Sequence, residues 1–144
     1  MAPSPFADLY AEVQNFYARQ MQSMDQRDFV AFAGTFTEDG EFSHTPGQLA
    51  RGRADIIAEL REFHRRFDGD PVVRRHWFGM TCLEPLDGQS WQATYYAYTV
   101  NTRPGAAAPT IGPSCLVTDV LVRTAAGLLN HSRYVRQDRL LLER

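Results

Sequence analysis

The sequence contains no lysine, and all 15 of its basic residues are arginine. An imine with a carbonyl substrate needs a side-chain amine, so Schiff-base catalysis by this chain is excluded. Basic charge is not in excess either, because 17 acidic residues give a formal net charge of −2 and a pI near 6.1. Binding to phosphate backbones depends on a basic surface, so we expect no nucleic-acid partner.

Long hydrophobic runs are also missing. No apolar stretch approaches the roughly 20 residues that a transmembrane helix requires. The first five residues, MAPSP, show neither the basic nor the apolar region of a signal peptide. We therefore expect a cytoplasmic protein with no membrane partner.

Cysteines and histidines are few and are not arranged as metal ligands. Cys82 and Cys115 stand far apart, so neither a disulfide framework nor a zinc site is indicated, and both are expected to be small buried residues. None of the four histidines has the HxH or i, i+4 spacing typical of metal sites. Glycine-rich nucleotide motifs and the GxSxG motif of serine hydrolases are absent as well. The sequence predicts a protein without a metal or cofactor.

The 144 residues are 44% hydrophobic and 12% aromatic, which predicts one domain with a substantial core. Apolar residues at spacings of three and four predict three helices, over about 5–24, 28–36 and 53–67. A turn at Asp39–Gly40 leads to a short predicted strand at 41–44. Segments rich in Val, Tyr, Thr and Trp predict four longer strands, at 72–84, 90–102, 114–123 and 128–139. This order favours an α+β domain, with helices on one face of a curved antiparallel sheet.

Two polar side chains are predicted to point inward from different elements. Strand alternation places His76 on a face with Phe78, Met80 and Cys82. On the first helix, the face of Tyr17 and Met21 continues at the next four-residue step to Asp25. A hydrogen bond from His76 to this carboxylate would fix the ring tautomer and leave the other nitrogen as a general base. A purely structural pair, or an aspartate that only ends the helix, is the alternative. His44, His64 and His131 are expected to be surface or core residues.

Five segments together carry a resemblance to a known family. They are Met24–Phe29, Phe36–Phe42, Gly52–Ile57, Arg75–His76, and Thr118–Arg123 followed by Gly127. In this order and spacing, the chain resembles the SnoaL-like branch of the nuclear transport factor 2-like superfamily over nearly its whole length. The resemblance implies one SnoaL-like domain over residues 1–144. It further implies a cone-shaped curved antiparallel sheet wrapped around three N-terminal helices, enclosing a deep apolar pocket.

The resemblance also implies a site. Scytalone dehydratase and hexachlorocyclohexane dehydrochlorinase have an aspartate at the end of the first helix and a histidine on the first long strand, and these fall on Asp25 and His76. There the histidine takes a proton from carbon while a leaving group departs. The chain departs from scytalone dehydratase by offering Asn101 where that enzyme has a second histidine, and Met24 where it has a tyrosine. Tyr95, which shares a strand face with Asn101, is a further candidate for hydrogen bonding to substrate.

One more acid is implicated in the same way. Asp119 falls where ketosteroid isomerases and some polyketide cyclases of the superfamily carry an inward acid, which when protonated can donate to an enolate oxygen. An outward Asp119 paired with Arg123 or Arg133 is the alternative. We therefore assign catalysis to His76 and Asp25, and substrate binding to Tyr17, Tyr95, Asn101 and Asp119.

These residues indicate a cofactor-independent dehydratase or polyketide-type cyclase that acts on a small hydrophobic substrate bearing a carbonyl. The alternatives are a non-catalytic ligand-binding or assembly domain resembling dioxygenase β subunits, and an epoxide hydrolase of the limonene type. A cavity beside His76 and Asp25 would favour the enzyme, and a filled cone would favour assembly. Trp77, Tyr96 and Tyr98, expected on the outer face of the sheet, predict a homodimer or homotrimer.

Overall fold

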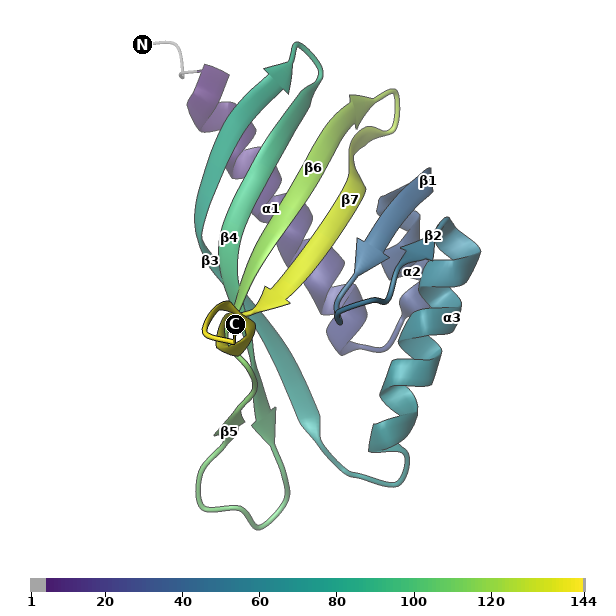
Figure 1. The fold of residues 1–144 in the computed structure, drawn as a ribbon, viewed down its shortest axis with the longest axis vertical. Coiled ribbons are helices and arrows are strands. Elements are labelled where there is room, and N and C mark those ends of the chain that lie inside the picture. The colour runs from purple at the N-terminus through teal and green to yellow at the C-terminus, as the bar shows by residue number, and fades with distance from the viewer. Residues whose placement is uncertain (1–4, 144) are drawn as a thin grey trace.

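The computed structural model describes residues 5–143, which form three α-helices, two short 3₁₀ helices and seven strands (Figure 1). The helices are α1 (Pro5–Asp25), α2 (Phe29–Gly34), α3 (Arg53–His64), η1 (Arg65–Phe67) and η2 (Asp138–Leu141). The strands are β1 (Phe36–Ser43), β2 (Ala50–Arg51), β3 (Val73–Asp87), β4 (Ser90–Thr102), β5 (Thr110–Ile111), β6 (Cys115–Thr124) and β7 (Gly127–Gln137).

All seven strands belong to one sheet with the order β2-β1-β7-β6-β4-β3, and β5 pairs with β4. Strands β3, β4, β6 and β7 form antiparallel pairs, as expected for hairpin-linked neighbours. Strand β1 lies parallel to β7, so the sheet is mixed rather than wholly antiparallel. The sequence predicts a wholly antiparallel sheet, and this prediction is wrong for β1. The parallel pairing is possible because β1 follows a helix and is not joined to β7 by a hairpin. Figure 1 shows the curved, unclosed sheet with α1 across it and α2 and α3 beside β1.

Strand β1 is longer than the sequence predicts. Helix α2 ends at Gly34, and the strand runs through the predicted turn at Asp39–Gly40. The pairing with β7 shifts register between Phe36 and Glu41. At Gly40 a Cβ atom would lie 3.0 Å from Phe36 Cβ and 3.0 Å from the Thr37 carbonyl oxygen, so this irregular backbone requires glycine. The turn signal therefore marks an irregularity inside a strand. The short strands β2 and β5 lie between the predicted elements, in segments for which the sequence predicts neither helix nor strand.

A second irregularity reverses the predicted faces of β3. The pairing of β3 with β4 shifts register between Gly79 and Cys82, and Met80 has a φ of 57°. Arg74, His76 and Phe78 keep their inward position, whereas Met80 and Cys82 are exposed. The expectation that Met80 and Cys82 share a face with His76 is wrong because the bulge turns the following side chains over. Cys115 is half-buried, so neither cysteine is a buried core residue.

The interior is divided into two packed clusters. One joins the end of α1 to α2, α3 and β1, around Phe32, Phe36 and Ile56. The other joins the start of α1 to the central strands, around Val13, Tyr95 and Leu121.

None of the helices in residues 5–143 is long and apolar enough to cross a membrane.

The outer face of the sheet carries the aromatic side chains that the sequence placed there. Trp77, Tyr96 and Tyr98 are 54%, 60% and 40% exposed. Trp77 pairs with Tyr98 across β3 and β4, and Tyr96 lies opposite Gly79. Self-association through these side chains stays a prediction.

Candidate active site

The end of α1 fixes the position of Asp25. The helix stops in a Schellman arrangement, in which the amide of Arg27 donates to the Met24 carbonyl and the amide of Asp28 donates to the Ser23 carbonyl, each at 2.9 Å. Arg27 supplies the left-handed residue of this motif, with a φ of 60°. Because the last turn is closed by these bonds, the Asp25 side chain leaves the helix in a defined direction, toward β3.

Asp25 receives two hydrogen bonds from His76. The ring Nδ1 of His76 lies 2.6 Å from Asp25 Oδ1, and the backbone amide of His76 donates to Oδ2 at 3.2 Å. Both side chains are largely buried, with 20% of His76 and 13% of Asp25 exposed. The ring proton belongs on Nδ1, since the carboxylate can only accept there. Within residues 5–143, Nε2 of His76 has no hydrogen-bond partner. The pairing predicted from helix and strand periodicity is therefore present.

His76 borders a cavity of about 170 Å³ between the helices and the sheet. Its walls are mostly apolar and aromatic, including Met21, Met24, Phe32, Phe42, Leu60, Phe63, Phe78, Ala97, Val117 and Val135. The polar side chains that reach it include His44, His64, Arg74 and Arg133. His76 also borders two adjoining hollows of about 390 and 250 Å³. For comparison, an apolar cavity of about 150 Å³ can hold benzene. The cone is therefore not filled by its own side chains.

Asp119 forms a buried ion pair with Arg133, which borders this cavity. The two residues face each other across β6 and β7, and they are 0% and 2% exposed. Arg133 Nε and Nη2 donate to the two carboxylate oxygens at 3.0 and 2.8 Å. The hydroxyls of Tyr17 and Tyr95 donate to Oδ2 at 2.8 and 3.0 Å. Asp119 therefore points inward, as in the first alternative. It is nevertheless paired with Arg133, which the second alternative predicted for an outward Asp119. Because all these partners are donors, the arrangement suits an ionised carboxylate and not an acid that donates to substrate.

The titration of this cluster follows from its burial. Burial and the neighbouring Asp119 raise the pKa of the Tyr17 phenol well above its ordinary value. Burial also raises the pKa of Tyr95, and Asp119 adds to this, while Arg133 opposes it. For Arg133, burial alone would lower the pKa, but Asp119 and the two phenols raise it overall. Tyr17 and Tyr95 are therefore neutral donors to Asp119, and this carboxylate occupies their hydroxyls.

One nitrogen of Arg133 is much less engaged than the others. Nη2 donates to Gln20 Oε1 at 2.6 Å and to Asn130 Oδ1 at 3.1 Å, besides Asp119. Nη1 has only the Met21 sulfur as a partner among the described residues, at 3.6 Å, and a thioether is a weak acceptor. Arg133 borders the cavity. The floor of the cavity therefore presents the positively charged Arg133 in a fixed orientation, and its Nη1 can donate a strong hydrogen bond to a ligand.

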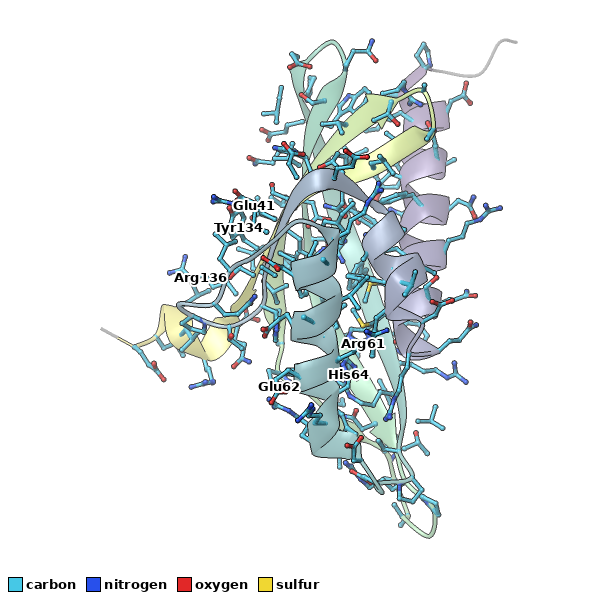
Figure 2. All side chains as sticks on the ribbon, turned by 90° about the vertical axis from the view of Figure 1, so that its right-hand side faces the viewer. Glu41, Arg61, Glu62, His64, Tyr134 and Arg136 are labelled. Atoms are coloured by element: carbon cyan, nitrogen blue, oxygen red, sulfur yellow. The ribbon has the colours of Figure 1, made fainter. Side chains whose placement is uncertain are left out.

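A second arginine borders the cavity near the end of α3. Arg74 Nε donates to Asn101 Oδ1 at 3.1 Å, and Nη1 lies 3.3 Å from His64 Nε2. His64 Nδ1 donates to the Leu60 carbonyl at 2.8 Å, which leaves Nε2 to accept from Arg74. The pKa of His64 is lowered to about 4, mainly by burial and also by Arg74, against the opposing effect of the Leu60 carbonyl. His64 is thus a neutral acceptor at pH 7. Figure 2 shows His64 and Glu62 on opposite sides of the last turn of α3.

The structure brings only part of the predicted set to the cavity. His76 borders it, Asp25 supports His76, and Asn101 is held by Arg74 outside the lining. Sequence reasoning missed Arg74 and Arg133, because an arginine whose partner is not visible in the sequence is normally exposed. The sequence named Arg133 only as a possible partner of an outward Asp119, and the signal that it points inward is the alternation that it shares with Val135.

The remaining histidines divide between the cavity and the surface. His44 borders the cavity, stacks on Phe42 with ring centroids 5.2 Å apart, and has Nε2 at 2.9 Å from Glu59 Oε1. His131 lies outside the lining beside Asp39, with 45% of its side chain exposed. No group of three or more potential metal ligands occurs in the described part of the chain.

Comparisons with known proteins support the fold. The chain is similar to the structure of ActVI-ORFA from Streptomyces coelicolor, with 51% identity and a TM-score of 0.86 over 92% of this chain and 96% of that chain. It is similar to Aln2 from a Streptomyces species, with 39% identity and a TM-score of 0.87 over 99% and 98% of the two chains.

A protein from Catenulispora acidiphila, whose structure was determined in complex with S-DNPA, is 46% identical. Its TM-score is 0.85 over 96% of this chain and 99% of that chain. The comparison with curated protein sequences gives no match. The model of the SnoaL-like domain matches residues 6–134, and the chain therefore belongs to the SnoaL-like family.

Proposed function

We propose that this protein is a cofactor-independent dehydratase or cyclase that removes a proton from carbon next to a carbonyl group. The observation that carries the proposal is the hydrogen bond of 2.6 Å between Asp25 and His76 Nδ1 in a histidine that borders the cavity, whose Nε2 has no hydrogen-bond partner among residues 5–143. In this role Nε2 takes the C–H proton, and the Asp25 carboxylate holds the ring and stabilises the imidazolium that forms. The partial exclusion of water strengthens both effects.

The negative charge that develops on the carbonyl oxygen needs a donor, and Arg133 is the best placed. Tyr95 and Asp119 are hydrogen-bonded to each other, and Asn101 is bound by Arg74 and does not line the cavity. Arg133 Nη1 is held by the bidentate contact to Asp119, so it stabilises an enolate without reorganising.

Two independent elements bring Arg133 and His76 within reach of one substrate. Met21, which contacts Arg133, lies one helical turn from Asp25 on α1. Phe78, whose ring centre is 5.3 Å from the Arg133 guanidinium carbon, lies two residues from His76 on β3. Arg133 and His76 also border the same cavity. A donor for the carbonyl oxygen and a base for the adjacent carbon can therefore act on one substrate bound there.

The outcome then depends on the substrate. Where a hydroxyl stands β to the carbonyl, the enolate electron pair expels it, the imidazolium returns its proton, and water leaves. Where a second carbonyl lies within reach, the enolate carbon attacks it, a ring bond forms, and the imidazolium protonates the new alkoxide. In both cases His76 ends in its starting protonation state, so no cofactor is consumed.

The family supports an enzyme over the alternatives. SnoaL-like proteins are typically cofactor-independent cyclases and dehydratases, and the structure of the Catenulispora relative in complex with S-DNPA supports a ligand-binding role. The open cavity does not suit an assembly domain with a filled cone. Among the described residues, Asp119 is the one carboxylate that Arg133 contacts, so the Asp–Arg–Asp set of a limonene-type epoxide hydrolase is incomplete.

Hydrogen–deuterium exchange tests proton removal directly. 2-Tetralone, a small fused-ring ketone with acidic C–H bonds, serves as the probe in D₂O, and exchange is followed by NMR. We expect the protein to accelerate exchange over buffer, and His76→Ala to return it to the buffer rate. His131→Ala is the matched control, because it removes an exposed histidine outside the cavity. A folded His76→Ala protein as active as wild type would contradict the role. So would bound 2-tetralone, seen by saturation transfer, without exchange.

A further inference from the structure

Arg74 carries a half-buried positive charge that no carboxylate of the described chain neutralises by contact. Its hydrogen-bond partners, Asn101 and His64, are both neutral. No carboxylate within residues 5–143 lies within 4.0 Å of it, and Nη2 has no hydrogen-bond partner there. Desolvating a cation is costly unless an opposite charge compensates it. The site therefore favours an anion from outside the chain.

The charges that act on Arg74 comprise one acid and three arginines, of which Arg103 is itself paired with Asp70 at 2.9 Å. Burial lowers its pKa most, and Arg27, Arg66 and Arg103 lower it further, while Asp25 raises it. Asp25 is the one acid in this balance, and its oxygens are occupied by His76. A bound anion would relieve this repulsion.

The guanidinium of Arg74 is held in a fixed orientation. Its central carbon lies 4.5 Å from the Phe67 ring centre and 5.8 Å from that of Phe63, so the group stacks on aromatic faces. Asn101 and His64 fix two of its nitrogens from the edge. Arg74 borders both the central cavity and the adjoining hollow of about 390 Å³. A planar, oriented guanidinium with a free nitrogen suits the geometry of a carboxylate.

From these contacts we propose a carboxylate-binding subsite at Arg74, so that the natural ligand is a hydrophobic carbonyl compound that also bears an acid group. Arg74 and His76 occupy the same inward face of β3, two residues or about 7 Å apart along the strand, and both border the cavity, so the acid group and the base lie on the same wall. The reacting carbon and the carboxylate are then several bonds apart on one molecule. The position of the reacting carbon rests on the proposed function, whereas the binding of the acid does not.

Binding of a matched acid and amide tests the subsite. The probes are 1-naphthylacetate and 1-naphthylacetamide, which have nearly the same shape and differ in charge, titrated calorimetrically at pH 7 and low salt. We expect wild type to bind the acid at least tenfold more tightly, and this preference to shrink as sodium chloride is added. In Arg74→Gln the preference should fall to within twofold, while the affinity for the amide stays the same. Arg61→Gln, which removes an exposed arginine of α3 (Figure 2), should keep the wild-type preference.

Arg74→Lys adds a second variant, which keeps the charge but loses the planar fork, and we expect an intermediate preference. Circular dichroism verifies that each variant is folded, and the wild-type comparison and its salt dependence need no variant at all. Equal affinities for acid and amide, no detectable binding of the acid, or a preference that survives in Arg74→Gln would each overturn the subsite. Because these measurements involve no turnover, their failure is separate from a failure of the exchange experiment at His76.

Discussion

Replacing Asp119 by asparagine removes one charge from the buried pair while keeping the shape of the side chain. Arg133 would keep Gln20 and Asn130 as acceptors but lose the one carboxylate that it contacts within the described residues. The new amide nitrogen would also face donors, since Tyr17 and Tyr95 both point at the position of Oδ2. We therefore expect a large loss of stability from a change of one atom.

The magnitude follows from burial. Asp119 is 0% exposed and Arg133 2% exposed, and breaking a buried pair by removing one partner costs about 3 to 5 kcal/mol of unfolding free energy. Arg133→Met, which leaves Asp119 with only the tyrosine hydroxyls, should cost about as much. The double variant leaves no uncompensated charge, so it should cost at least about 2 kcal/mol less than the two single changes added together.

Urea unfolding followed by circular dichroism measures these differences, with the slope m showing whether the transition stays two-state. Arg123→Met is the control, because the Arg123–Glu12 pair is 37% and 42% exposed and should contribute only about 0 to 1 kcal/mol. A cost below about 1 kcal/mol for Asp119→Asn, or simple additivity in the double variant, would refute the view that a desolvated charge pair holds the cavity floor.

Three further predictions concern other parts of the molecule. Asp25→Asn should slow exchange of 2-tetralone by about 10²- to 10⁴-fold with little change in its affinity, and unchanged exchange would count against an orienting role. Because the folded pKa of His64 is about 4, the unfolded chain binds more protons between pH 4 and 6.5. Stability should therefore fall by about 1 to 3 kcal/mol as the pH drops through that window, and His64→Gln should remove this dependence in urea titrations. Met80→Gly should be about 1 kcal/mol more stable than Met80→Ala by thermal unfolding, since both remove the same exposed side chain but only glycine suits a φ of 57°; equal stabilities would argue against backbone strain there.

Much of the fold and one pair of the site could be predicted because they depend on short-range periodicity. Apolar spacing predicts the helices and the four long strands, and the same periodicities direct Asp25 and His76 inward from α1 and β3. The register shift in β3 follows Phe78, so it leaves the inward direction of His76 untouched. It reverses Met80 and Cys82, because one extra residue in a strand exchanges its two faces.

The sequence by itself determined the order of the three helices and the four long strands, the absence of a lysine nucleophile, and the inward direction of His76 and Asp25. Only the tertiary structure decided that Asp119 pairs with Arg133 and that Arg74 has neutral partners at the cavity. Asp119 and Arg133 are 14 residues apart, and Arg74 and Asn101 are 27 apart, so their contacts depend on strand register. The charge that a buried arginine presents to a cavity is set by the partners that packing gives it, and local sequence does not specify those partners.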